Sequence, residues 1–548
     1  MNLATIDIVV LVIYSILILS VGLFVSRTKK GEKKTSSDYF LASKSLPWWA
    51  VGTSLIAANI SAEQFIGMSG SGFAVGLAIA SYEWMAALTL IIVGKYFLPI
   101  FIEKGLYTIP QFLEKRYNAR VKSIIAIFWI ALFVFVNLTA VMFLGATAMD
   151  TIIGSGDGSL ILSSIIVLAL FTTAYSVWGG LSSVAWTDVI QVAILIIGGL
   201  ITTGIALYHV SPDHSLLGGM EYIFSKAPEK FDMILEKGHK EYNNLPGIAV
   251  LVGGIWIANI YYWGFNQYII QRTFAAKSLK ESQKGIVFAA ILKMIVPLIV
   301  IIPGIIAYVM YTENPDIASE FLDAAGNHQN DKAYPWLVST FVPAGLKGLV
   351  LAALAAAIVS SLASMLNSTA TIFTMDLYKP LINKNASEKQ LVTVGRLTGV
   401  VALVIAAILA PILGGIDQVF QFIQEYTGLV SPGILAIFIL GLFWKKTTAR
   451  AAIIGALVSI PIAFYLKFGP QIFENSPLFP SLPFMHQMSI TFLATCAIMI
   501  GISLSQNKGK DDVKGIEIEK GFFKTDKTYN VLSYAVIIML IVLYTIFW

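Results

Sequence analysis

The sequence contains a single cysteine and little charge. Cys496 stands alone among 548 residues, so no disulfide can form within the chain and a thiolate metal site is not expected. Charged residues make up only 13% of the sequence, whereas hydrophobic residues make up 57%. Soluble domains have about 25% charged residues. This composition predicts an all-α polytopic membrane protein, with the lipid bilayer as its surroundings.

The motifs of common enzymes and ATP-driven pumps are also missing. The sequence contains no phosphate-binding loop, no dinucleotide-binding glycine pattern, no GxSxG and no HExxH. The longest polar stretches, 209–246 and 312–345, are too short for an independent catalytic domain. The histidines show no metal-ligand spacing. We therefore expect neither an enzyme nor a nucleic-acid-binding protein.

Long apolar runs are abundant. A crossing needs about 20 apolar residues, and the runs predict fourteen transmembrane helices. They lie near residues 5–26, 47–72, 76–102, 121–149, 158–178, 183–208, 247–270, 283–311, 346–376, 393–412, 418–443, 449–467, 484–504 and 528–548. The first run is followed by its basic residues instead of being preceded by them, which favours a spanning helix over a signal peptide.

The distribution of lysine and arginine predicts the orientation. Basic residues gather in alternate loops, which the positive-inside rule places in the cytoplasm. These loops are 27–44, 104–122, 272–284, 379–396, 445–450 and 508–527. Both termini are then extracytoplasmic. The short link 178–183 is an exception, because it should be cytoplasmic and has no basic residue.

One apolar run cannot be an ordinary membrane helix. The stretch 54–68, SLIAANISAEQFIGM, carries Asn59, Ser61, Glu63 and Gln64 within six residues. Such a cluster is tolerated in a membrane only where it faces protein or a water-filled cavity. It predicts a helix broken near mid-membrane, whose freed carbonyls could hold a sodium ion and a polar solute.

A second run, NIYYWGFNQ (259–267), is interrupted in the same way. Each interrupted helix begins a set of five, over 47–208 and 247–443, which predicts two inverted repeats. The remaining parts would be a first helix with a basic loop (1–46) and three peripheral helices (444–548). We expect the binding site where the two repeats meet.

Two charged residues within apolar runs require an explanation. Glu83 is either an interfacial carboxylate or an acceptor for a polar solute. Lys293 either extends its ammonium to the membrane surface or meets a carboxylate or solute hydroxyls, since an unpaired charge at that depth costs at least about 2.5 kcal/mol. Both alternatives stay open from the sequence.

Amides and aromatic rings occur together at Asn259, Tyr262, Trp263 and Asn266. Sugars are bound by such mixtures, because hydroxyls require polar partners while the ring faces lie against aromatics. Aromatics in membrane helices also form interfacial belts, so this pattern alone is weak. Gln424 and the adjacent Glu425 place another amide and a carboxylate among aromatic residues in a different predicted helix.

A helix of small residues carries four serines, Ser360, Ser361, Ser364 and Ser368. The serines could simply allow close helix packing. Alternatively, the first two could join the freed carbonyls of the broken helix in an all-oxygen site for a hard cation. Asp188 is an acid within an apolar run and could guide that cation electrostatically.

Several stretches carry a family resemblance. YSVWGGLSSVAWTDVIQ (175–191) and GLVSPGILAIFILGLFWKKTTARAAIIG (428–455) resemble the two signatures of the sodium:solute symporter family. SLPWWAVGTSLIAANISAEQFIGMSGSG, NIYYWGFNQYIIQRT and AALAAAIVSSLASMLNSTATIFTMD are similar to bacterial sugar-carrying members of that family. The resemblance covers nearly the whole chain. It implies fourteen helices with a broken-helix core of two inverted five-helix repeats, and it allows a homodimer.

The resemblance also implies roles for individual residues. The sugar, galactose or glucose, would be held by Gln64, Glu83, Asn259, Lys293 and Gln424, with Asn59 nearby. Tyr262 would form the inner gate, and the outer hydrophobic gate would consist of Met68, Tyr82 and Phe420. Sodium, the co-transported ion, would be coordinated by the carbonyls of Ala57, Ile60 and Ala357 and the hydroxyls of Ser360 and Ser361, with Asp188 on its exit path. Ala86 stands where a serine is expected, which removes one hydroxyl from the sugar site.

The resemblance therefore predicts alternating-access import of one sugar with one sodium ion. Two competing functions share parts of this pattern. A symporter for another solute, such as proline or sialic acid, would use the same sodium site without needing Lys293, Glu83 and Gln424 together. A sensor or channel would bind sugar without sodium-driven accumulation.

Overall fold

The computed structural model describes residues 3–25, 44–105, 108–154, 156–322, 326, 328–473 and 480–548. The expected basic loop 27–44 lies almost wholly outside them. The described backbone is helical, and its strand-like pairs are two isolated bridges, Leu46–Ala276 and Leu322–His328. The predicted all-α fold is therefore confirmed.

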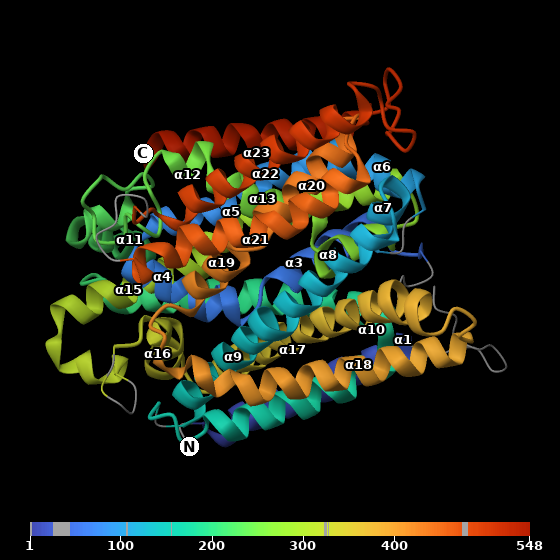
Figure 1. Cartoon of the computed structure of the whole chain (residues 1–548). Coiled ribbons are helices and arrows are strands. Elements are labelled where there is room, and N and C mark those ends of the chain that lie inside the picture. Colours follow the sequence, from blue (N-terminus) through green and yellow to red (C-terminus); the bar gives the residue numbers. More distant parts are fainter. Residues whose placement is uncertain are drawn as a thin grey trace.

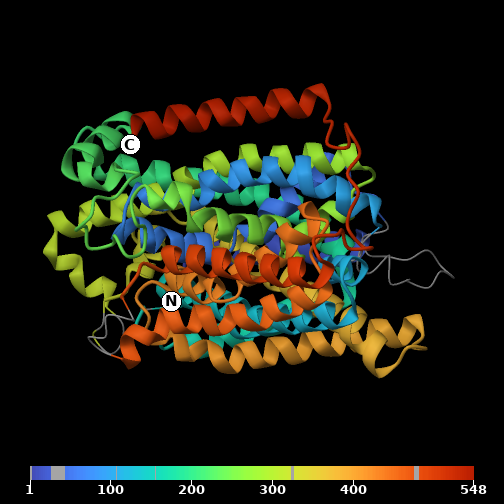
Figure 2. The same ribbon diagram turned by 45° about the horizontal axis from the view of Figure 1, so that its top comes forward.

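Most of the long helices run side by side along one direction (Figures 1 and 2). Both chain termini lie at the same end of this bundle, at the left in Figure 1. We call it the N/C end. The connections from α17 to α18 and from α22 to α23 lie at the opposite end, which we call the basic end.

The first half of the chain supplies the following elements. They are α1 (Thr5–Val25), α3 (Trp48–Asn59), η2 (Glu63–Met68), α4 (Ser69–Ala74), η3 (Leu77–Ala80), α5 (Ser81–Ile92), η4 (Val93–Phe97), α6 (Leu98–Glu103), α7 (Ile109–Arg116), α8 (Ala119–Ala131), η5 (Leu132–Leu138), α9 (Thr139–Ile153), α10 (Ile161–Val210), α11 (Leu216–Lys226), η6 (Pro228–Phe231), α12 (Ala249–Val252), α13 (Gly254–Ile260), η7 (Tyr261–Phe265) and α14 (Gln267–Phe274).

The second half supplies the remaining elements. They are α15 (Leu279–Glu313), η8 (Pro315–Phe321), η9 (Asn330–Lys332), α16 (Ala333–Phe341), α17 (Leu346–Ile372), η10 (Phe373–Ile382), α18 (Glu388–Leu409), η11 (Ala410–Gly415), α19 (Val419–Gly428), α20 (Ser431–Phe443), α21 (Ala449–Ile472), α22 (Phe484–Asn507) and α23 (Lys527–Ile546).

Ten helices in the described ranges are long and apolar enough to cross a membrane, and the bent pair α19–α20 makes up to eleven. The chain is thus a multi-pass membrane protein. Several expected crossings are divided into short helices, and these are too short to be recognised as membrane spans by their length and composition. The total of fourteen, the division 1–46, 47–208, 247–443 and 444–548, and the inverted repeat remain predictions.

One expected boundary falls within a helix. The link 178–183 was predicted to separate two spans, but α10 continues through it as one helix of 50 residues. Helical hydrogen bonding can pass through Gly179 and Gly180, since a glycine costs only about 1 kcal/mol in a helix. A straight helix of this length would extend about 75 Å, more than twice the hydrocarbon thickness of a bilayer. Its apolar parts are Ile161–Ala174 and Val184–Val210.

Both predicted helix interruptions are present. The helix α3 ends at Asn59, and Ile60 has extended backbone angles before the chain turns into η2. In the second interrupted run, Asn266 is extended between η7 and α14. The polar stretches recognised in the sequence therefore coincide with real breaks in the helices.

A close approach of α3 and α15 brings distant polar residues together. A Cβ atom on Gly52 would lie 2.6 Å from the carbonyl oxygen of Gly285, so only glycine allows this contact. Small residues permit such backbone approach in membrane helices. Asn59 and Lys293 lie about two helical turns beyond this glycine contact. The packing of the two glycines thereby positions the side-chain amide of Asn59 opposite the ammonium group of Lys293.

Candidate functional site

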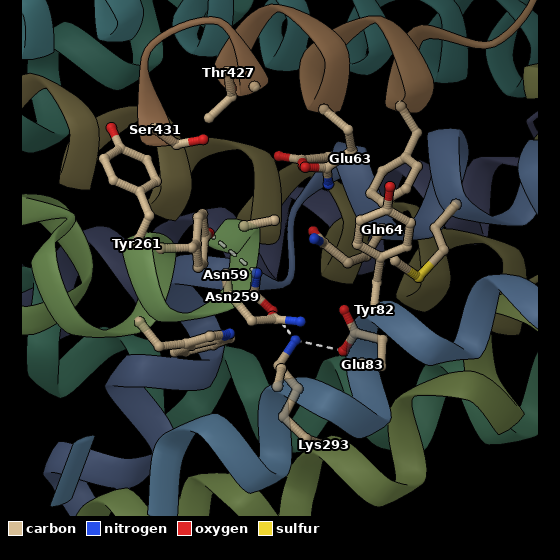
Figure 3. Close-up of a pocket in the computed structure, with 18 of the residues that line it drawn as sticks. Asn59, Glu63, Gln64, Tyr82, Glu83, Asn259, Tyr261, Lys293, Thr427 and Ser431 are labelled. Atoms are coloured by element: carbon tan, nitrogen blue, oxygen red, sulfur yellow. Dashed lines mark hydrogen bonds and ion pairs between the residues drawn. The ribbon is translucent and has the colours of Figure 1, made fainter. Parts of the chain in front are cut away.

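A buried cavity lies where the two interrupted helices meet (Figure 3). All six predicted sugar-binding residues and all four predicted gate residues line it. The full lining is Asn59, Glu63, Gln64, Met68, Tyr82, Glu83, Ala86, Ala258, Asn259, Tyr261, Tyr262, Trp263, Lys293, Phe420, Gln424, Thr427, Gly428, Ser431 and Met488. Residues from six segments of the sequence thus converge on one space.

The cavity is small in this conformation. Its volume of about 50 Å³ leaves room for a few water molecules. Ligand pockets typically have about 300 Å³ or more. A solute as large as a sugar therefore requires the walls to move apart.

An ion pair lies at the bottom of the cavity. The ammonium of Lys293 donates hydrogen bonds to Glu83 Oε2 and to Asn59 Oδ1, as Figure 3 shows. It also lies 4.9 Å from the ring centroid of Trp263. Lys293 is fully buried and Glu83 is 3% exposed. These positions exclude the alternatives of a lysine extending to the membrane surface and an interfacial glutamate.

The break after α3 releases backbone carbonyls. In a continuous helix the amide of Ser61 would donate to the carbonyl of Ala57, but here it donates to Gln64 Oε1 at 3.0 Å. In a continuous helix the amide of Gln64 would likewise donate to the carbonyl of Ile60, but here it donates to the carbonyl of Ser61 at 3.2 Å. The carbonyls of Ala57 and Ile60 are the two that the sodium prediction names from this helix.

The serine helix α17 packs against this break. Ser361 donates its hydroxyl proton to the carbonyl of Ala58 at 3.2 Å, and Ser360 donates to Asp188 Oδ1. Ala357 lies one turn earlier on the same helix. A hydroxyl that donates its proton away keeps oxygen lone pairs for a cation. The structure therefore brings Ser361 into direct contact with the end of α3, next to the residues whose carbonyls the break releases.

Asp188 lies at the centre of a buried hydrogen-bond network. Ser54 Oγ donates to its Oδ2 at 2.5 Å, and the guanidinium of Arg272 forms an ion pair with it at 3.5 Å. Arg272 also donates to Ser54 at 2.8 Å and to Ser364 at 2.5 Å. The network ties α3, α10, α14 and α17 together beside the serine pair.

Arg272 corrects one sequence interpretation. The charge pattern assigned it to a cytoplasmic loop, 272–284, but it belongs to α14 and is 1% exposed. The signal that could have revealed it is Asp188, because a carboxylate buried in an apolar run requires a partner of opposite charge. The role of Asp188 in sodium exit remains a prediction.

The predicted gates close the cavity in two different ways. The rings of Tyr82 and Phe420 meet edge to face at 5.2 Å, and Met68 is 1% exposed beside the same cavity. Phe420 is the second residue of α19, which starts at the N/C end, so this apolar contact lies on that side. Each gate residue therefore occupies a position compatible with its predicted role.

On the side of the basic end, the closure is polar. Asn59 Nδ2 donates to the hydroxyl of Tyr262 at 3.1 Å, and Tyr268 donates to the same hydroxyl at 2.6 Å. Tyr262 follows Asn259 along the chain toward α14 and the basic end. The amide of Asn59 thus touches both the ion pair and the predicted inner gate.

Other cavity groups remain available to a ligand. Among the described residues no group accepts a hydrogen bond from Asn259 Nδ2, although the atom is buried. Gln424 extends from α19 into the lining, and Ala86 occupies the wall where a serine hydroxyl was expected. The cavity therefore presents a buried donor without an acceptor, and the methyl group of Ala86 where a hydroxyl was expected.

Four polar residues of the lining were not predicted from the sequence. Glu63, Tyr261, Thr427 and Ser431 were not assigned to the site, although the first belongs to the broken stretch. Thr427 and Ser431 flank the junction of α19 and α20, where the pair bends by 49°. Thr427 lies within the glutamine-bearing run QFIQEYTG, and Ser431 follows that run by three residues.

The chain shares its family with known transporters. It matches the sodium:solute symporter family over residues 39–459. It is 59% identical to a protein of Vibrio parahaemolyticus named sodium/glucose cotransporter, and the match covers 100% of this chain and 99% of that protein. It is 33% identical to sodium/glucose cotransporter 1 of Sus scrofa, over 83% of this chain and 71% of that protein.

A solved structure shares the fold. A Na+-coupled sialic acid symporter in a substrate-bound, outward-open state superposes with a TM-score of 0.77 at 24% identity, covering 91% of this chain and 98% of that chain. At this identity the likeness concerns the fold alone. From the family match and the full-length relative, the chain belongs to the sodium:solute symporter family.

Proposed function

We propose that this transporter imports a monosaccharide, galactose or glucose, driven by one sodium ion per sugar. The observation that carries the proposal is the buried cluster of Glu83, Lys293 and Asn59 against Trp263. It combines an acceptor, an ammonium, an amide and an aromatic face, which together match the hydroxyls and ring face of a sugar. The 59% identical relative is named a sodium/glucose cotransporter.

Sugar hydroxyls would replace contacts that the cavity already makes. Glu83 would accept from a hydroxyl and Lys293 would donate to one, while Gln64, Asn259 and Gln424 supply further amides. A buried polar group left without a partner costs roughly 1–3 kcal/mol. A solute lacking hydroxyls at these positions would therefore bind much more weakly.

Sodium would bind between α3 and α17. Its ligands would be the carbonyls of Ala57, Ile60 and Ala357 and the hydroxyls of Ser360 and Ser361, an all-oxygen shell. The first two belong to the same broken stretch as Gln64 and Asn59. Sodium bound there would stabilise the arrangement of the stretch in which the sugar groups are assembled. This shared segment couples the two ligands.

The sodium gradient suffices for accumulation. One charge moving through 100 mV gains about 2.3 kcal/mol, and a tenfold concentration ratio adds about 1.4 kcal/mol. Together these could maintain a sugar gradient of at most a few hundredfold.

The orientation follows from charge. We place the basic end in the cytoplasm of a bacterium and the N/C end, with both termini, outside the inner membrane. The apolar closure by Met68, Tyr82 and Phe420 then faces outward, and Tyr262 faces inward. A homodimer is compatible with this arrangement but is not needed for the pathway, because one chain builds the whole cavity.

The test is uptake of labelled galactose and labelled glucose into proteoliposomes under an inward sodium gradient, with potassium replacing sodium as the control. We expect accumulation above the external concentration only with sodium. Absence of accumulation of both sugars, in vesicles that still bind sodium, would overturn the sugar assignment. Binding without any accumulation would indicate a sensor.

A further inference from the structure

A short turn at the N/C end, η9 (Asn330–Lys332), is inserted among the ends of several helices. Asn330 donates from its backbone amide and its Nδ2 to the carboxylate of Asp417, at 2.9 and 2.8 Å. Lys332 Nζ donates to the carbonyl of Gly156 at 2.6 Å and to that of Leu322. The turn thus fastens the connections that precede α10 and α19.

The central residue of this turn, Asp331, holds the start of α19. Its Oδ2 accepts a hydrogen bond from the backbone amide of Val419 at 3.0 Å, and the residue is 2% exposed. Val419 is the first residue of α19, where backbone amides have no helical acceptor. The next residue is Phe420, which forms the apolar closure with Tyr82. Asp331 therefore fixes the helix end that carries this closure.

The same residue touches the other arm of the closure. A Cβ atom on Gly70 would lie 2.3 Å from Asp331 Oδ1 and 2.8 Å from its Cα and backbone nitrogen. Gly70 belongs to α4 and lies two residues after Met68. The backbone of the turn thus rests directly on α4, which follows η2 and its last residue Met68, and the absence of a side chain at Gly70 permits the contact.

We propose that Asp331 is a positioning residue for the outer gate. Its side chain and backbone hold α19 and α4 together in the closed state. Asp331 lies between α19, which carries Phe420, and α4, which directly follows Met68. Outward opening has to separate these elements, so the bond from Val419 must break or the turn must move with one of them. Loss of that bond should make the gate open more often. The inference rests on the proposed gate and orientation.

The experiment measures access to the cavity directly. The reporter is Thr427→Cys, which lies in the cavity lining, in a background with Cys496→Ser. A membrane-impermeant methanethiosulfonate reagent is added outside right-side-out vesicles without sodium or sugar. Burial and the nearby Asp417 charge raise the pKa of Asp331 well above its usual range, so all variants are labelled at the same pH.

We expect Asp331→Ala to label about fivefold faster, the change that loss of a helix cap produces. Asp331→Asn should stay near the parent rate, because its amide oxygen can accept the same bond. The matched control is Asp316→Ala, an exposed aspartate in η8 of the same connection. Gly70→Ala should also accelerate labelling, because its methyl group would displace the turn.

Parent-rate labelling of a folded Asp331→Ala protein would overturn the proposal, and so would equal acceleration in Asp331→Asn. If Asp331→Ala does not fold, parent-rate labelling of Gly70→Ala overturns it instead. Labelling needs no sugar, so failure of the sugar assignment is seen separately in the uptake assay. Repeating the reaction on inside-out vesicles tests the orientation independently.

Discussion

The sugar cavity and the neighbouring serine–aspartate region both bury polar groups inside the bundle, but they differ in how these groups are satisfied. In the cavity, the buried Asn259 Nδ2 has no acceptor among the described residues. In the other region, Asp188 accepts from Ser54 and Ser360 and pairs with Arg272. The cavity therefore has a hydrogen-bond donor left for a ligand, whereas the polar groups around Asp188 are hydrogen-bonded to one another.

The difference suggests how the two ligands act. A polar solute can enter the cavity by completing bonds that are missing, once the walls have moved apart. A cation at Ser360 and Ser361 has to use lone pairs of hydroxyls whose protons are already committed, and it must coexist with the Asp188–Arg272 pair. A cation bound at the proposed site would therefore act on a network that joins α3, α10, α14 and α17. The proposed coupling would pass through this network, and each prediction below tests one side of the comparison.

The largest effect is expected from the serine pair. Ser360→Ala combined with Ser361→Ala removes both side-chain oxygens proposed to bind sodium, and we expect sodium-driven uptake to be abolished in proteoliposomes. Thr369→Ala is the matched control, because this buried hydroxyl of α17 donates to the carbonyl of Met365 in its own helix. Undiminished sodium stimulation in the double variant would rule the site out.

The ion pair in the cavity should give the next largest effect. Lys293→Ala leaves the Glu83 carboxylate buried without its partner, which typically costs about 3–5 kcal/mol of stability. The double variant Glu83→Gln, Lys293→Met removes both charges and should regain most of the thermal stability in detergent. Uptake should stay lost in both variants. Sugar uptake by the double variant would show that the pair is structural only.

The polar closure should give a smaller effect. Tyr262→Phe removes the hydroxyl that accepts from Asn59 and Tyr268. Two hydrogen bonds at about 0.5–1.5 kcal/mol each predict roughly tenfold faster sugar release. Efflux from vesicles preloaded with labelled sugar measures this rate, and Tyr534→Phe, on an exposed face of α23, is the control. An unchanged efflux rate would argue against Tyr262 as a gate.

The smallest effect is expected at the cavity wall. Ala86→Ser adds one hydroxyl beside the sugar groups, and one hydrogen bond predicts roughly two- to fivefold tighter binding of the preferred sugar. Competition between galactose and glucose measures whether the preference also changes. Ala87→Ser is the control, because Ala87 is buried but does not line the cavity. Equal changes in both variants would show that the new hydroxyl does not reach the sugar.

Most of the cavity could be predicted because polar groups inside lipid are costly. Asn59, Gln64, Glu83 and Lys293 each stand out within an apolar run, and the structure places all of them on one cavity. Arg272 could not be distinguished from a loop charge, because it lies at the end of such a run. Its burial depends on Asp188, which is 84 residues away in the sequence.

The role of Asp331 in η9 could not be predicted from the sequence, for a different reason. Asp331 lies in a polar connection of mixed charge, where one more aspartate carries no signal. Its burial follows from Gly70 and Val419, which belong to other parts of the chain. A local pattern cannot reveal a contact whose partners are distant in the sequence.

The sequence by itself determined the apolar helices, the two interruptions and the polar residues that the membrane must accommodate, because each follows from local composition and the cost of burial in lipid. Only the tertiary structure decided which of these groups meet. Lys293 pairs with Glu83 across 210 residues, since helix packing, such as the contact of Gly52 with Gly285, sets the distance between them. The pairing of buried charges is therefore a property of the packed bundle, in which the low dielectric surroundings make an unpaired charge too costly to remain.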